Sequence, residues 1–404
     1  MPNANKVFLI LFFIFTFNLI IVFYYCKIKN SKMIIHKTQG SFFLNQTQVW
    51  VLYSGIWGNT ETDGEWIGWS VPHDEWSNSY FEPPHSIPSL YFPQLGLYSC
   101  HHYLTLKHQI KSMIDAGINA ILLTWTSHNQ FLDQTLKYFL RLSTKLPFQI
   151  SIIIPEYTNR SILTLYQDIS TFISSYSSEE SILKVNNYPI IIIENTYNIL
   201  NLAKENISAH IKYFDINENF YINENINNYN NFFKKTDYQQ LISKLKLSNK
   251  NSFLLGTGSS KNEAFNALDD GFNGFVSYYP SDYFSTLADP NTWKFDVHYF
   301  KSRKFLYIPT VSPGFNMSAK NIKFSKLSRS RRGGIRYEQQ WKKAIDSEPE
   351  VILINSFNNW HYGTSIEPIS VDNPQFPIDN NIWAGNNSQA FMILTKKWIK
   401  IYQK

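Results

Sequence analysis

A dense group of polar and aromatic residues lies near the carboxyl end of this 404-residue chain. The stretch from Ser356 to Glu367 reads SFNNWHYGTSIE and follows an apolar, β-branched run, so it begins where a predicted strand ends. It puts Trp360 and His361 side by side. Sugars stack their C–H faces on aromatic rings and form hydrogen bonds with amides, imidazoles and hydroxyls. These residue types therefore predict a carbohydrate-binding site.

The same stretch resembles the signature S-F-N-E-W-H-E-G-T-x-I-E of glycoside hydrolase family 99, the endo-α-1,2-mannosidases of the secretory pathway. The matching residues are Ser356, Phe357, Asn358, Trp360, His361, Gly363, Thr364, Ile366 and Glu367. Shorter matches occur in order along the chain: Trp66-x-x-Trp69, Gly271-Phe-Asn-Gly274, Asn291-x-Trp293 and Arg329-x-Arg331. The resemblance covers roughly residues 50–367.

This resemblance implies a (β/α)8 barrel in the lumen of the Golgi that cleaves mannose-rich N-glycans internally, with retention of configuration and no cofactor. In the family, one carboxylate deprotonates the 2-hydroxyl of the sugar and a second protonates the leaving oxygen. The partner would be a mannose-rich N-glycan or a glycoprotein that carries one. The residues that the resemblance implies as sugar contacts are Trp57, Trp66, Trp125, Tyr157, Arg160, Tyr197, Trp360 and His361.

Both carboxylate positions of the family signature are substituted in this chain. Asn359 occupies the first position and Tyr362 the second. An amide cannot act as a base, and a phenol with a pKa of about 10 is a poor acid. A positioned acid or base typically contributes about 10² to 10⁴ in rate. The sequence therefore predicts a catalytically degenerate member of the family that still binds mannose-rich glycans.

Other carboxylates keep an alternative open, in which the chain is an active, retaining endo-α-mannosidase that uses a relocated group. Glu367 is retained, and Glu156 and Glu194 follow predicted strands. Glu156 is displaced by one residue from the carboxylate of the family, and such a displacement in a strand turns the side chain to the other face. All three carboxylates also fit purely structural hydrogen-bonding roles.

The elements that must position these residues are predicted from eight apolar runs, at 48–54, 118–125, 148–154, 189–193, 252–256, 274–279, 304–311 and 351–357. Near-continuous hydrophobicity is typical of strands buried on both faces of a parallel sheet. Apolar residues at helical spacing predict helices at 102–117, 162–176 and 335–348. The alternation favours a (β/α)8 TIM barrel, with its chemistry at the carboxyl ends of the strands. An open doubly wound sheet is the rival, but no Gly-rich nucleotide motif follows a strand.

An apolar segment precedes the barrel. Residues 7–25 contain no charge and span about 28 Å as a helix, close to one bilayer core. We interpret them as a single-pass transmembrane signal anchor of a type II Golgi membrane protein. The other predicted segments are a short tail at 1–6, a stem at 26–49, and a barrel at 50–404 with an Asn-rich insertion near 215–235.

Composition excludes several other classes of protein. Aromatic residues reach 17%, which argues against a disordered chain. A net charge of +6 is modest for this length and gives no reason to expect nucleic-acid binding. No H-E-x-x-H or C-x-x-C pattern predicts a metal site. No D-x-D triplet supports a metal-dependent glycosyltransferase, which the membrane anchor alone would allow.

Overall fold

The computed structural model describes residues 44, 46–70, 81–157, 160–197, 235–278, 286–316, 328–373, 383 and 387–404. Internal contacts divide the chain into two units, Met1–Ser41 and Phe42–Lys404, and the described residues belong to the second. The predicted tail, the membrane anchor and nearly all of the stem lie outside the described residues, as does the Asn-rich insertion up to residue 234. Among the helices of the described residues, none has the length and apolar character needed to span a membrane.

Parallel strands form a closed barrel in the described part of the chain. They are β1 (Gln48–Tyr53), β2 (Ala120–Thr124), β3 (Gln149–Ile154), β5 (Tyr188–Ile193), β6 (Phe253–Gly258), β7 (Gly274–Ser277), β8 (Leu306–Ile308), β9 (Thr310–Val311) and β10 (Val351–Ile354). Only Pro309, which has no N–H to donate, separates β8 from β9. Because β8 pairs with β7 and β9 pairs with β10, this one segment closes the ring, and the predicted parallel α/β barrel is confirmed.

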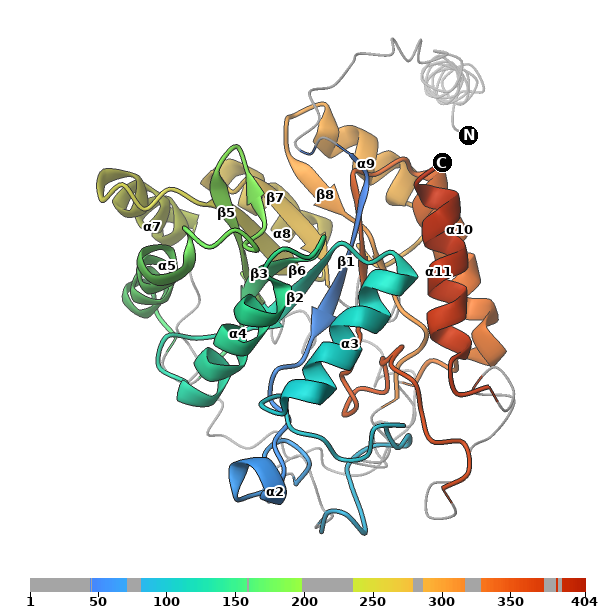
Figure 1. Cartoon of the computed structure of the whole chain (residues 1–404). Coiled ribbons are helices and arrows are strands. Elements are labelled where there is room, and N and C mark those ends of the chain that lie inside the picture. Colours follow the sequence, from blue (N-terminus) through green and yellow to red (C-terminus); the bar gives the residue numbers. More distant parts are fainter. Residues whose placement is uncertain are drawn as a thin grey trace, which may run out of the picture. The chain divides into compact units, whose positions relative to one another are not determined.

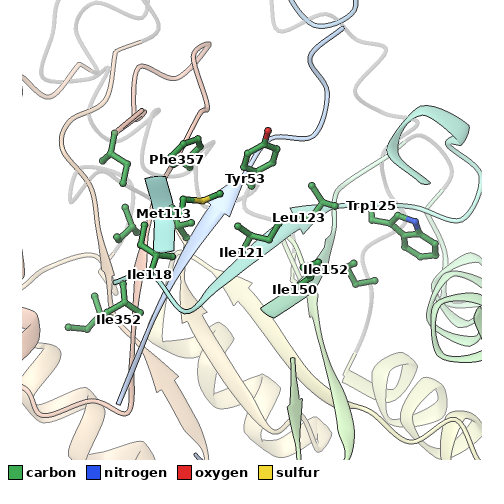
Figure 2. Packing of buried hydrophobic residues seen from close by; sticks show 14 of the residues in the cluster. Tyr53, Met113, Ile118, Ile121, Leu123, Trp125, Ile150, Ile152, Ile352 and Phe357 are labelled. Carbon is green, nitrogen blue, oxygen red and sulfur yellow. The ribbon is translucent and has the colours of Figure 1, made fainter. Parts of the chain in front are cut away.

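Side chains along each strand alternate between the inside and the outside of the barrel. On β5, Ile190 and Ile192 belong to the interior cluster, whereas Ile191 and Ile193 belong to the cluster under the helices. Figure 2 shows part of the outer cluster, in which Ile121, Leu123, Ile150 and Ile152 lie near Met113 and Trp125. The same alternation determines which side chains just beyond the strand ends face into the barrel.

Helices surround the strands (Figure 1), and their bounds are α3 (Tyr103–Ala116), α4 (Gln130–Ser143), α5 (Ile162–Tyr176), α7 (Lys235–Leu247), α8 (Lys261–Asp270), α9 (Trp293–Lys301), α10 (Ile335–Asp346) and α11 (Ala390–Tyr402). Short helical turns form α2 (Thr60–Asp63) and η3 (Arg332–Gly334). Sequence chemistry sets several of the ends. Ser161 and Thr164 form a capping box at the start of α5. Gly117 ends α3 with a φ of 92°, as predicted for a C-cap.

Each of the eight predicted apolar runs overlaps a strand of the barrel, with β8 and β9 both in the run 304–311, and the three predicted helices correspond to α3, α5 and α10. One strand was not predicted. The two-residue strand β4 (Lys184–Val185) pairs with the start of β5 through a hairpin at Asn186 and Asn187. Both asparagines have positive φ, as the two-residue hairpin turn of type I′ requires.

Candidate functional site

The loop that follows β10 is fastened to the carboxyl end of the barrel. The Asn358 side chain holds the end of β1, because its Oδ1 accepts from the Ser54 N–H at 2.7 Å and its Nδ2 donates to the Ser54 carbonyl at 3.1 Å. The hydroxyls of Ser356 and Thr364 lie 2.8 Å apart and close the loop on itself. The frame of the family signature is therefore rigidly built.

Arg331 is only 1% exposed and holds the backbone of this loop through hydrogen bonds. Its Nη2 donates to the carbonyl oxygens of Gly363 and Ser365 at 2.8 and 2.9 Å. Its guanidinium lies 4.5–4.7 Å from the centroids of three aromatic rings: Tyr91, Trp383 and Phe391. A buried arginine that stacks on rings and forks between two carbonyls fixes the loop backbone around residue 362.

Asn359 and Tyr362, which align with the two carboxylate positions of the family signature, are both at least partly exposed. Asn359 is half-buried, and its Oδ1 accepts from the Tyr362 N–H at 3.3 Å. Tyr362 is 43% exposed and stacks on Phe315, with ring centroids 6.0 Å apart. The pKa of Tyr362 is nevertheless raised to about 12, first by desolvation and then by the charge of Glu194. The phenol is thus a weaker acid than free tyrosine.

Glu367, which the sequence left as a candidate catalytic group, is buried and 1% exposed. Its two oxygens accept from the Tyr98 hydroxyl at 2.7 Å and the Gln109 side-chain amide at 2.6 Å. Burial raises its pKa to about 8. Both oxygens of Glu367 thus bond to protein groups, and its role as a substitute acid or base stays a prediction.

Three of the aromatic residues expected to contact sugar, Trp57, Trp125 and Trp360, are fully buried. Trp57 packs against Trp69 with ring centroids 4.2 Å apart, and Trp125 packs against helix α5. The Trp360 indole donates to the Tyr98 hydroxyl at 3.3 Å. All three rings form part of the core cluster, and their role as sugar contacts stays a prediction.

The remaining expected contacts are half-buried and serve mainly to hold loops. Tyr157 donates to Asp168 at 2.7 Å, and Tyr197 donates to Asp270. The Arg160 guanidinium donates to the carbonyls of Glu194 and Asn195 at 2.6 and 2.9 Å.

One ring nitrogen of His361 lies 2.7 Å from the Gly68 carbonyl. Trp66 packs on the core and leaves part of its surface exposed. Exposed Glu156 accepts from the Asn195 amide at 2.8 Å.

Three residues at the strand ends form what we call the barrel mouth: Glu194, Tyr278 and Asn355. Glu194 continues the inward phase of Ile190 and Ile192, and Tyr278 packs on the interior cluster. The Glu194 carboxylate accepts from the Tyr278 hydroxyl and from the Glu156 N–H, while desolvation raises its pKa. Asn355 donates to the Tyr278 carbonyl at 2.9 Å. Glu194 is thus an inward-facing carboxyl group at the functional end of the barrel.

The Glycosyl hydrolase family 99 profile matches residues 44–214 and 242–404, most of the chain. The chain belongs to this family. The resemblance found in the signature stretch is therefore confirmed at the level of the family.

Relatives and solved structures agree with membership of family 99. The chain is 23% identical over 374 residues to the mouse glycoprotein endo-alpha-1,2-mannosidase-like protein, covering 87% of this chain and 76% of that protein. It is 22% identical over 372 residues to mouse glycoprotein endo-alpha-1,2-mannosidase, covering 87% and 74%. The GH99 endo-alpha-mannosidase of Bacteroides thetaiotaomicron shares the fold, with a TM-score of 0.72, 20% identity and coverage of 88% and 97%.

Within the described residues, no group of three or more His, Cys, Asp or Glu side chains could hold a metal ion. A concavity of about 320 Å³ lies instead at the amino ends of the strands, lined by residues such as Gln48 and Gln149. Because barrel enzymes place their sites at the opposite end, we assign it no role in the chemistry.

Proposed function

We propose that this family 99 protein binds mannose-rich N-glycans, or glycoproteins that carry them, at the carboxyl end of its barrel without hydrolysing them by the two-carboxylate route. The observation that carries the proposal is the loop after β10. Its frame is fully anchored by Asn358 and Arg331, yet an amide and a phenol occupy positions 359 and 362. A binding surface has kept its support while the acid–base pair has been replaced.

The chemistry of the Asn359 and Tyr362 side chains supports the proposed loss of hydrolysis. The Asn359 amide has no basic nitrogen, and its oxygen caps the Tyr362 N–H. A phenol with a pKa of about 12 holds its proton too tightly to act as an efficient acid near neutral pH. The retained Glu367 is buried beneath the loop and bonded through both oxygens.

The test is to purify the full chain in detergent and titrate it with a mannose-rich N-glycan, then to incubate it with the glucosylated form of that glycan. We expect saturable binding and no release of a glucosylated mannose unit. Absence of binding would overturn the binding function, and release at the rate of an ordinary glycosidase would overturn the loss of hydrolysis.

A second candidate function is an active endo-α-mannosidase with a relocated carboxylate. It is favoured by one observation, that Glu156 and Glu194 both lie at strand ends on the functional side of the barrel. On this alternative, Glu156→Gln or Glu194→Gln abolishes turnover of the glucosylated glycan. Equal rates in the wild type and both variants would exclude these two groups.

We also propose that residues 7–25 anchor the chain in the Golgi membrane as a single-pass type II protein, with the barrel in the lumen. The support is the uncharged run itself, together with the family resemblance. The test is protease digestion of sealed microsomes that carry the full chain with a carboxyl-terminal tag. Protection of the tag is expected, and its digestion without detergent would contradict the orientation.

A further inference from the structure

The concavity of about 320 Å³ at the amino ends of the strands is lined by three amide side chains, Gln48, Asn119 and Gln149. Gln48 begins β1, Asn119 precedes β2, and Gln149 begins β3. Backbone hydrogen bonds hold these positions together, because the Asn119 N–H donates to the Val49 carbonyl and the Gln149 N–H donates to the Asn119 carbonyl, both at 2.9 Å. The three amides therefore lie in a row across three neighbouring strands.

Two of these amides are oriented by hydrogen bonds to the protein. The Gln48 Oε1 accepts from the Trp50 indole at 2.7 Å, and the Asn119 Oδ1 accepts from the Val49 N–H at 2.8 Å. Both protein partners are N–H donors, so each amide must turn its oxygen to the protein and keep its NH2 group for another acceptor. Within the described residues, neither NH2 group is bonded to a further protein group.

Further polar groups line the same concavity. Lys145 is exposed and lies in a turn that is closed by the Leu146 N–H and the Ser143 carbonyl at 3.0 Å. The Ser143 hydroxyl is buried, and it forms no hydrogen bond in the part of the chain that the structure describes. Glu180 is the acidic side chain of the lining, and Lys145 offsets its charge. The lining thus combines a net charge of zero with available N–H donors on two amides and a lysine.

We propose that this concavity binds a small carboxylate at the amino end of the barrel. The NH2 groups of Gln48 and Asn119 donate to the carboxylate oxygens, and the Lys145 ammonium supplies the opposite charge. Hydrogen bonds to an ionised acceptor are about twice as strong as those between neutral groups. A monoanion fits better than a phosphate dianion, because Glu180 repels the second charge. The volume lies at the lower end of the range for ligand pockets, which suits a molecule the size of a hexonic acid.

This site is separate from the loop after β10. Strand β1 runs from Gln48 at the concavity to Tyr53, a length of about 17 Å at 3.3 Å per residue. Ser54, which follows Tyr53, is the residue that the Asn358 side chain holds at the opposite end of the barrel. Carboxylate binding therefore does not compete with the proposed glycan binding, and the two can be measured independently.

The experiment uses the full chain in detergent, with D-gluconate as the probe and D-gluconamide as its neutral counterpart, and measures binding by calorimetry. We expect saturable binding of gluconate in the millimolar range. Gluconamide should bind at least about tenfold more weakly, because it lacks the charged acceptor. Absence of gluconate binding, or equal affinity for the two probes, would overturn the site.

Gln48→Glu and Asn119→Asp test the two amides while leaving their structural hydrogen bonds in place. Each variant keeps the oxygen that accepts from the protein and replaces the NH2 group with a second carboxylate oxygen, which repels the ligand. Gluconate should bind at least about tenfold more weakly to each. The matched control is Gln339→Glu, which adds the same charge at an exposed amide on α10 and should bind as the wild type does.

Thermal unfolding reports whether each variant keeps the fold. Lys145→Met changes an exposed side chain, so it tests the site even if the amide variants unfold, and it should weaken gluconate binding about threefold. Wild-type affinity in a folded Gln48→Glu or Asn119→Asp variant, or in Lys145→Met, would overturn the assignment.

Discussion

The Tyr98 hydroxyl donates a hydrogen bond of 2.7 Å to the buried carboxyl group of Glu367, 269 residues further along the chain. The same oxygen accepts from the Asn358 amide at 3.1 Å and the Trp360 indole at 3.3 Å. One phenol thus ties the segment before α3 to the whole loop after β10. The residues that match the family signature therefore support the loop from within.

Glu367 should make the stability of the protein depend on pH. Its pKa is raised by burial from 4.5 to about 8, so the folded state holds this proton more tightly than the unfolded state does. The stabilisation is fully present below about pH 4.5 and is lost as the pH rises to about 8, at up to about 1.4 kcal/mol per pH unit. Urea unfolding between pH 5 and 8 measures this slope.

Glu367→Gln removes the titrating group and should flatten that slope. The control is Glu180→Gln, an exposed carboxylate beside the concavity at the amino ends of the strands, which should leave the slope as it is in the wild type. Equal slopes in the wild type and Glu367→Gln would show that Glu367 is ionised at neutral pH in the folded protein.

Arg331→Lys should destabilise the protein although it keeps the positive charge. Lysine cannot fork between the Gly363 and Ser365 carbonyls, nor stack as a plane on three rings, and its ammonium is harder to desolvate. We expect a loss of about 2–4 kcal/mol in the free energy of unfolding. The exposed Arg141→Lys on α4 should change it by less than about 0.5 kcal/mol, and an equal effect of the two variants would refute the role of Arg331.

Gly363→Ala should displace the loop that carries Tyr362. Gly363 has a φ of 59°, and a Cβ there would lie 2.9 Å from the Asn316 carbonyl oxygen. Gly64→Ala is a matched comparison, because Gly64 has a φ of 82° with nothing within 4 Å of the added Cβ. Both variants incur the backbone strain of about 1–2 kcal/mol, and only Gly363→Ala adds a clash. Thermal unfolding should therefore rank Gly363→Ala as the less stable, and the reverse order would contradict this packing.

The apolar runs predicted the barrel because parallel strands buried on both faces need continuous hydrophobic residues. The same continuous hydrophobicity gave no sign of which side chains at the strand ends face into the barrel. Ile190, Ile191, Ile192 and Ile193 give no alternation, so the inward phase of Glu194 follows only from the packing of the strand. The Asn186-Asn187 pair was a usable signal for the missed hairpin, since asparagine tolerates positive φ.

The buried tryptophans could not be recognised from sequence for a different reason. Trp57 and Trp360 follow strand ends, where the barrel architecture predicts site residues. Their burial depends on contacts with segments distant in the chain, such as Trp69 and Tyr98. Residue type and position relative to a strand predict the end of the barrel, but they do not distinguish a ring that meets ligand from one that supports the loop.

Restoring both signature carboxylates tests whether the supporting frame still suits catalysis. In the double variant Asn359→Glu and Tyr362→Glu, we expect hydrolysis of a glucosylated mannose-rich glycan to appear, with a gain of at least about 10² over the wild type. Each single variant should give less, because an acid and a base act together. Mass spectrometry of the released sugar measures the gain, and a single variant as active as the double one would contradict the need for a pair.

The most direct test of the central claim is the hydrolysis rate of the unmodified full chain on a glucosylated mannose-rich N-glycan, with an active family 99 endomannosidase assayed in parallel. Our proposal that Asn359 and Tyr362 stand in place of the acid–base pair predicts binding without measurable release of a glucosylated mannose unit. Release at roughly 1 s⁻¹ or faster, the range of ordinary enzymes, would contradict it.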